Sequence, residues 1–398
     1  MAIIQPFQPF RYSAKAGDPA RLLTQPYDKI GPEMQARYLA ASPYNLVRVI
    51  LDEQRDYQRA ARYFDDWIRD GILAQDAAPG LYAYFQEFEA PDSGERLNRK
   101  GFIGLGKIED YSAGVVFRHE QTLSGPKKDR LELLRHTRAH FGQIFMLYPD
   151  PGGAVDALLE ESTRCAPVLD VLDEYQARHR VWPIPDRARI DRIQELMAPK
   201  KLLIADGHHR YETALAYRDE NPGLAAAGYV MMTFVNMYSP GLKILATHRV
   251  LRNLAGLNIE EFLRKVSDKW TVTEYKGPLE PRPSSVRIGV LTAQGRWLLE
   301  CPRKDGELDV PILHQELLAG ALGIGEEEVR DEKHIKYVRG IDAAAAEVRE
   351  HGAQVTFLLE PTPIEDMAGI AFSGGVMPQK STDFYPKLLS GVTIYRVA

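Results

Sequence analysis

Apolar residues recur every three or four positions in several stretches of the chain, a spacing that places them on one face of a helix. In the clearest stretch, from Gln54 to Leu73, Tyr57, Phe64 and Trp67 fall at this spacing and Gly71 offers a stop. The same spacing predicts further helices over 127–141, 186–197, 211–220, 258–270 and 312–322.

Shorter apolar runs between these segments predict strands. Residues 81–89 are rich in Tyr and Phe, and a polar turn separates them from a similar run at 101–109, which together indicate a hairpin. Further strands are predicted at 144–148, 201–205, 229–238, 243–247 and 271–275, a second hairpin at 286–291 and 296–301, and a β-α-β run over 335–359.

This mixture of strands and helices predicts a mixed α/β (α+β) fold. A chain of 398 residues exceeds one ordinary compact core, and the proline-rich stretch 277–285 is the best linker candidate. We therefore expect three parts, an N-terminal α/β extension (1–110), a core with the candidate catalytic segments (111–276) and a C-terminal α/β module (286–398) that closes the site.

Composition narrows the class of protein. The chain is 44% hydrophobic and 26% charged, as in a soluble globular protein, and its net charge of -5 gives no general attraction for nucleic acid. Cys165 and Cys301 stand far apart with no zinc-ligand spacing, so neither a disulfide framework nor a structural zinc site is expected. We see no signal peptide or membrane span, and we expect a cytoplasmic protein with no membrane partner.

The densest polar motif is Ala-Asp-Gly-His-His-Arg, from Ala205 to Arg210. It lies where a predicted strand passes into a helix, and such a turn presents free amide groups to an anion. Arg210 suits phosphate, His208 and His209 can donate to phosphoryl oxygens or move a proton, and Asp206 can hold a metal ion. Alternatively, Asp206 only caps the helix and the histidines lie on the surface. A zinc site with Glu212 is a minor option that lacks a third ligand.

The second motif is Arg118-His119-Glu120-Gln121-Thr122, followed by a Gly-Pro turn and Lys127. Glu120 is a candidate general base, since a carboxylate can accept the proton of an attacking hydroxyl, while His119 and Lys127 are candidate phosphate ligands. An ordinary solvated loop explains this composition equally well.

The third motif, Lys380-Ser381-Thr382, could present an ammonium group, hydroxyls and amides to a phosphate. The Walker pattern that would make it specific is absent. We expect the irregular stretch 377–392 around it to be functional. Near the N-terminus, Pro26-Tyr27-Asp28 and the segment 42–48 are interpreted as structural turns, with Asn45 and Arg48 as possible substrate contacts.

Together these three motifs resemble the domain of unknown function 1015 family. Its hallmarks are His-Glu-x-Thr, Ala-Asp-Gly-His-His-Arg and Met-Pro-x-Lys-Ser-Thr, here at His119, Ala205 and Met377, and the resemblance runs nearly end to end. The chain is more distantly similar to the archaeal free serine kinase of the ParB/sulfiredoxin-like group, which carries related segments in the same order.

That resemblance implies a ParB/sulfiredoxin-like core and a kinase that converts free L-serine to O-phosphoserine. Glu120 would act as base, Asp206 to Arg210, including Gly207, would hold phosphoryl groups with Mg²⁺, and Lys380, Ser381 and Thr382 would close the site. The donor is ATP, ADP or pyrophosphate, because the candidate ligands read phosphate and not a base. A nucleotide-gated switch without kinase activity and a metal-dependent phosphate ester hydrolase are the alternatives.

Overall fold

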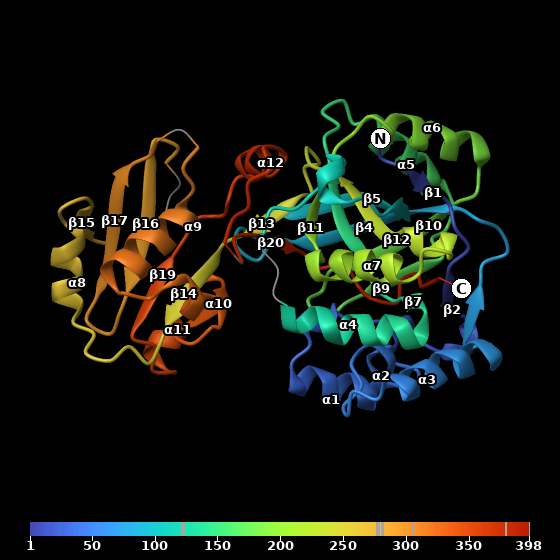
Figure 1. Ribbon diagram of the computed structural model, residues 1–398, viewed down its shortest axis with the longest axis horizontal. Helices are drawn as coiled ribbons and strands as arrows, with labels where there is room; N and C mark the ends of the chain where they lie inside the picture. The colour runs from blue at the N-terminus through green and yellow to red at the C-terminus, as the bar shows by residue number, and fades with distance from the viewer. Residues whose placement is uncertain (121–123, 276–278, 280–281, 305, 379, 398) are drawn as a thin grey trace.

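The computed structural model describes residues 1–120, 124–275, 279, 282–304, 306–378 and 380–397. The described residues form two lobes, each built around a sheet, with a short β-ribbon between them (Figure 1). Among these residues, nine strands form the larger sheet and six form the smaller one. The predicted mixed α/β class is confirmed, and the ParB/sulfiredoxin-like assignment of the core stays a prediction.

The larger sheet is mixed, with the order β6-β11-β8-β12-β5-β4-β10-β9 and β1 added against β5. Among the described strands of this sheet, only β6 with β11 and β8 with β12 pair in parallel. The strands are β1 (Ile4–Gln5), β4 (Leu81–Glu89), β5 (Arg96–Lys107), β6 (Val116–Phe117), β8 (Ile144–Tyr148), β9 (Leu169–Leu172), β10 (Arg178–Ile184), β11 (Leu202–Asp206) and β12 (Tyr229–Asn236). The predicted hairpin at 81–109 is confirmed as β4 and β5, which pair antiparallel.

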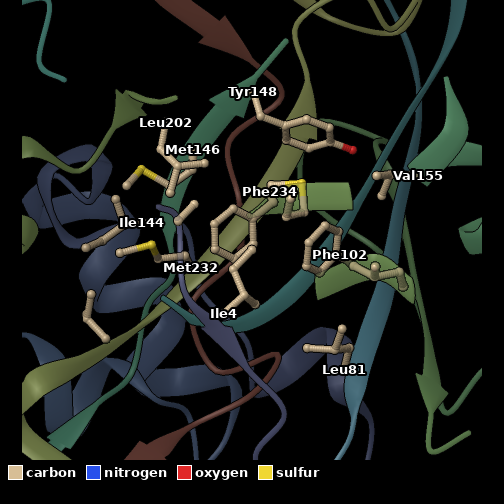
Figure 2. Close-up of a cluster of buried hydrophobic side chains, with 14 of the residues drawn as sticks. Ile4, Leu81, Phe102, Ile144, Met146, Tyr148, Val155, Leu202, Met232 and Phe234 are labelled. Atoms are coloured by element: carbon tan, nitrogen blue, oxygen red, sulfur yellow. The ribbon is translucent and has the colours of Figure 1, made fainter. Parts of the chain in front are cut away.

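Both faces of this sheet are buried, because successive side chains of a strand point to opposite sides. On β8, Ile144, Met146 and Tyr148 face one core, while Phe145 and Leu147 face the other. The first core packs under helices α5 (Ala154–Glu161), α6 (Arg187–Met197) and α7 (His208–Glu220), and its centre is drawn in Figure 2. The second is covered by the C-terminal segment, including α12 (Ile364–Phe372).

The N-terminal helices form a separate layer under the larger sheet. They are α1 (Pro32–Ala41), α2 (Val47–Ile50) and α3 (Tyr57–Arg69), and α3 packs against α4 (Ser124–Thr137). Figure 1 shows α4 between this layer and α7. Short pairs β2 (Phe10–Tyr12) with β3 (Leu73–Gln75) and β7 (Ala139–His140) with β21 (Tyr395–Arg396) secure the two chain ends.

The smaller sheet is antiparallel throughout, with the order β15-β17-β16-β19-β14-β18. Its strands are β14 (Thr247–Leu251), β15 (Thr271–Glu274), β16 (Ser285–Leu291), β17 (Arg296–Pro302), β18 (Ile335–Arg339) and β19 (Val355–Leu358). Its helices are α8 (Ile259–Val266), α9 (Asp309–Ile312), α10 (Glu326–Arg330) and α11 (Ile341–Arg349), with a π-helix at Leu313–Ala321. The helix predicted at 312–322 is therefore mostly a π-helix.

A ribbon of β13 (Lys243–Leu245) and β20 (Asp383–Tyr385) lies between the lobes and brings the C-terminal segment back to the larger sheet. The larger sheet takes strands from both 1–110 and 111–276, because β5 pairs with β12, so the first two expected domains share one sheet. The smaller sheet begins at β14, ahead of the expected linker. The three-part division stays a proposal. No helix in the described part of the chain is long and apolar enough to cross a bilayer.

Candidate functional site

The predicted strand-to-helix turn at Asp206 is confirmed. β11 ends at Asp206, Gly207 adopts a φ of 97°, and α7 begins at His208, three residues before the predicted start. Glycine is suited to this left-handed conformation. The free amide groups of the first turn of α7 give this end of the helix a positive potential.

Asp206 is held between two cations. Its Oδ1 accepts a hydrogen bond from Lys387 Nζ at 3.0 Å, and its Oδ2 accepts one from Arg210 Nη2 at 2.5 Å. Burial alone would raise the pKa of the Asp206 carboxyl, but Lys387 and Arg210 outweigh it and hold that pKa well below its usual range. Arg210 also donates to the backbone carbonyl of Gln143. Asp206 is therefore an ionised anchor for two basic side chains.

Lys387 connects this turn to the lobe that contains the smaller sheet. Its Nζ also lies 3.1 Å from Asp383 Oδ1, and Asp383 Oδ2 accepts from Arg339 Nε of β18 at 2.6 Å. Burial would lower the pKa of the Lys387 ammonium group, but Asp206 and Asp383 raise it above its usual value. The chain of charges Asp206, Lys387, Asp383 and Arg339 thus runs from β11 to the smaller sheet.

The second and third motifs meet at Glu120. Its Oε1 accepts hydrogen bonds from the amides of Ser381 at 3.0 Å and Thr382 at 3.3 Å. Burial would raise the pKa of the Glu120 carboxyl, but the neighbouring His119, and then His208 and Lys380, lower it to about 2. Glu120 is thus a carboxylate at neutral pH.

Two histidines stand beside Glu120. His119 is fully buried, with Nδ1 bonded to the carbonyl of Ile204 and Nε2 to Thr382 Oγ1, both at 2.8 Å. Its ring meets His208 edge to face, with ring centroids 4.8 Å apart. Burial, and then the nearby His119, lowers the pKa of His208 to about 3, so His208 is neutral at pH 7. A neutral ring can donate one hydrogen bond to a phosphoryl oxygen or accept one from a hydroxyl.

These groups open into one cavity of about 520 Å³ between the lobes. Of the predicted site residues, Glu120, Asp206, His208, Lys380 and Thr382 line it. The cavity wall also carries charged side chains from the N-terminal turn, the end of the C-terminal segment, β18 and the turn before β18: Asp28, Lys29, Glu332, Lys336, Arg339, Asp383 and Lys387.

Other predicted residues have different positions. Arg210 lines a smaller cavity of about 70 Å³ with Tyr27 and Arg130, and His209 lines neither of these two cavities. Lys127 Nζ lies 3.7 Å from Glu212 Oε2 on α7. Ser381 is buried with its hydroxyl donating to Pro378, and it reaches the site through its amide. Gln121, Thr122 and Gln379 of the motifs lie outside the described residues.

Sequence reasoning missed Lys29, Lys387 and the side chains of β18. Lys387 follows the third motif within the stretch 377–392 that we expect to be functional, so that expectation was a usable signal. Lys29 follows Pro26-Tyr27-Asp28, a segment that its sequence predicts to be a structural turn. Lys336 and Arg339 belong to a lobe in which no local motif marks them.

The donor set at Asp206 does not fit a magnesium ion held by the protein. Both carboxylate oxygens already contact cationic side chains, so a metal ion there would have to displace Lys387 or Arg210. Within the described ranges, no group of three or more His, Cys, Asp or Glu side chains is arranged to hold a metal ion. The expected role of Asp206 as a metal ligand is therefore not supported by the contacts of its carboxylate.

Comparison with known families and solved structures identifies proteins that are similar to this chain. A family model described as "Protein of unknown function (DUF1015)" matches residues 4–329, most of the chain and both lobes. The chain belongs to the DUF1015 family. This confirms the resemblance drawn from the three motifs. No curated protein matches the sequence.

Several solved structures are similar to this DUF1015 chain at low identity. A conserved hypothetical protein from Pyrococcus furiosus has 12% identity and a TM-score of 0.37, covering 69% of this chain and 89% of its own. A free serine kinase variant in complex with ADP has 13% identity and a TM-score of 0.37, covering 68% and 84%. A C-terminally truncated SbnI from Staphylococcus aureus has 10% identity and a TM-score of 0.37, covering 72% and 85%. Likeness of this degree does not assign a function.

Proposed function

We propose that this protein is a phosphotransferase that transfers a phosphoryl group to the hydroxyl of free L-serine and forms O-phosphoserine. The observation that carries the proposal is the position of Glu120, an ionised carboxylate in a cavity that also holds Lys380, Lys387 and the first turn of α7. A carboxylate beside an anion site is the arrangement that phosphoryl transfer to a hydroxyl requires.

In the proposed reaction, the serine oxygen attacks the terminal phosphorus of the donor. The new bond joins that oxygen to phosphorus, and the bond from phosphorus to the leaving group breaks. The leaving group keeps the electron pair and is ADP from ATP, AMP from ADP, or phosphate from pyrophosphate. The hydroxyl proton passes to Glu120. Within the described residues, the amides of Ser381 and Thr382 both donate to Oε1, which leaves Oε2 for the substrate.

A pKa near 2 makes Glu120 a weak base, and this suits phosphoryl transfer. The transition state is loose, so catalysis depends mostly on positioning and charge stabilisation, and the base mainly orients the hydroxyl. In this proposal Lys380 and Lys387 neutralise phosphoryl oxygens, and neutral His208 bonds to the transferring group. Arg210 acts indirectly, because its guanidinium is engaged by Asp206 and Gln143.

Serine as the acceptor rests on the resemblance of the three motifs to related segments that stand in the same order in the free serine kinase. The donor stays open among ATP, ADP and pyrophosphate, and Mg²⁺ is proposed as a companion of the donor phosphates.

The decisive experiment incubates the full chain with serine and each donor, with and without Mg²⁺, and looks for phosphoserine by mass spectrometry. Replacing the base in Glu120→Gln should lower turnover about 10²- to 10⁴-fold and leave donor binding intact. Glu95→Gln, at an exposed carboxylate outside the cavity, is the matched control.

Other outcomes separate the alternatives. Donor binding without a phosphorylated product would favour a nucleotide-gated switch. Release of phosphate without phosphoserine would favour a hydrolase. Full turnover in Glu120→Gln would overturn the assignment of the base.

A further inference from the structure

A turn near the N-terminus reaches into the cavity between the lobes. Gln25, Asp28 and Lys29 line that cavity beside Asp206 and Lys387. The turn includes the 3₁₀ helix Tyr27–Lys29 and follows Gln25, which is almost fully buried. This segment is therefore part of the cavity wall.

Gln25 fixes the start of this turn. Its side-chain amide donates to Asp173 Oδ2 at 3.2 Å, and its backbone amide donates to the hydroxyl of Tyr38 at 3.1 Å. Asp173 is in turn bonded to the buried ring of His179 at 3.3 Å. An anchored backbone loses little freedom when Lys29 binds a ligand.

The ammonium group of Lys29 stands among charges that are already engaged. Within the described residues it has no ion pair within 4.0 Å, and nearby Asp383 is shared by Arg339 and Lys387. Burial lowers the pKa of Lys29 below its usual value, and Lys387 and Lys380 also lower it, while Asp383 and Asp28 oppose them in part. An anion placed between these ammonium groups would relieve their mutual repulsion.

We propose that Lys29 is an anion-binding residue of this site and that its ammonium group contacts a phosphate of the phosphoryl donor. The geometry in favour is the shared cavity of Lys29, Lys380 and Lys387. Lys387 is already paired with Asp206 and Asp383, whereas within the described residues Lys29 and Lys380 have no ion pair within 4.0 Å. Two such ammonium groups match the several negative charges of a diphosphate or triphosphate better than the single charge of the serine carboxylate. The role as a donor ligand rests on the proposed function, whereas anion binding by Lys29 can be tested without turnover.

The consequence concerns the N-terminal extension. If Lys29 binds the donor, the extension completes the site with a ligand from 91 residues before Glu120 in the chain. It would then be required for donor affinity.

The test compares Lys29→Gln, Lys29→Arg and Lys15→Gln in the full chain. Lys15 is exposed, belongs to the same N-terminal region and does not line the cavity, so it is the matched control. Binding of pyrophosphate and of ADP is measured by calorimetry, and thermal unfolding confirms that each variant folds. Because a hydrogen bond to a charged group contributes about 1.5–3 kcal/mol, Lys29→Gln should weaken binding about 10- to 100-fold. Lys29→Arg should restore part of the affinity.

Kinetics distinguish the donor from the acceptor. The KM for the donor should rise in Lys29→Gln while the KM for serine changes little. A rise for serine alone, or unchanged pyrophosphate binding, would overturn the proposal. If the wild type makes no phosphoserine but binds pyrophosphate through Lys29, the kinase function fails together with the role as a donor ligand, and anion binding by Lys29 stands. If the wild type is active and Lys29→Gln binds pyrophosphate and ADP normally, the kinase function stands and the role of Lys29 fails. If the wild type binds neither pyrophosphate nor ADP, both fail.

Discussion

Glu120 accepts a hydrogen bond from the amide of Ser381 at 3.0 Å, although 261 positions separate the two residues in the chain. This contact joins the second and third motifs, and the parallel bridge between Glu120 and Met377 supports it. The carboxylate is thus held by backbone groups, whose positions do not depend on side-chain rotamers.

We expect Thr382→Val to destabilise the protein by about 1–3 kcal/mol, because it leaves a buried polar atom without a partner. His119 Nδ1 faces the carbonyl of Ile204, which only accepts, so in the neutral ring Nε2 accepts the Thr382 hydroxyl proton. Urea unfolding measures the loss, and Thr382→Ser, which keeps the hydroxyl, is the control.

Phosphoserine formation in Thr382→Val should fall less than in Glu120→Gln, because the amides that hold Glu120 remain. Equal stability of the Val and Ser variants would refute this reading of the bond.

We expect His208 to make the protein less stable as the pH falls below about 6.5. The folded protein keeps His208 neutral down to a pKa of about 3, while the unfolded chain takes up the proton near its usual value of 6.5. The unfolded state therefore binds more protons in this window, and stability falls with pH by up to about 1.4 kcal/mol per unit. His208→Gln should reduce the slope between pH 6.5 and 5 by up to about 1.4 kcal/mol per unit. The slope that comes from other buried histidines with a lowered pKa, such as His140, His248 and His314, should remain.

The measurement is the free energy of unfolding in urea at several pH values. His351→Gln, at an exposed histidine outside the cavity, is the control and should keep the wild-type slope. An undiminished slope in His208→Gln would show that His208 does not contribute to the pH dependence.

We expect Gly207→Ala to destabilise the protein more than Gly114→Ala. Both glycines have positive φ, 97° and 64°, so both variants carry backbone strain of about 1–3 kcal/mol. A Cβ at position 207 would lie 3.0 Å from Arg210 Nε, whereas nothing lies within 4 Å of one at position 114. The difference between the two free energies of unfolding combines the displacement of Arg210 from Asp206 with the larger strain at a φ of 97°, which lies outside the left-handed region of alanine. Similar losses in both variants would mean that Arg210 moves at little cost.

Local sequence features predicted much of the fold. The helix at 57–69, the hairpin of β4 and β5, and the turn at Asp206 follow from apolar spacing and from glycine in a left-handed conformation. The order of the strands could not be predicted, because β5 pairs with β12 through contacts between residues far apart in sequence. The π-helix at Leu313–Ala321 was missed, because its apolar spacing resembles that of an α-helix.

The sequence by itself determined where the polar strand-to-helix turn with Asp206 and His208 lies, because this turn is a local arrangement of neighbouring residues. Only the tertiary structure decided which cationic side chains lie at this turn and at the cavity beside it. Lys387 reaches Asp206 across 181 positions, Arg210 turns to Gln143, and Lys29 enters the cavity from an N-terminal turn. Such pairings depend on how the two lobes and the chain ends pack. The local spacing of apolar residues does not specify that packing.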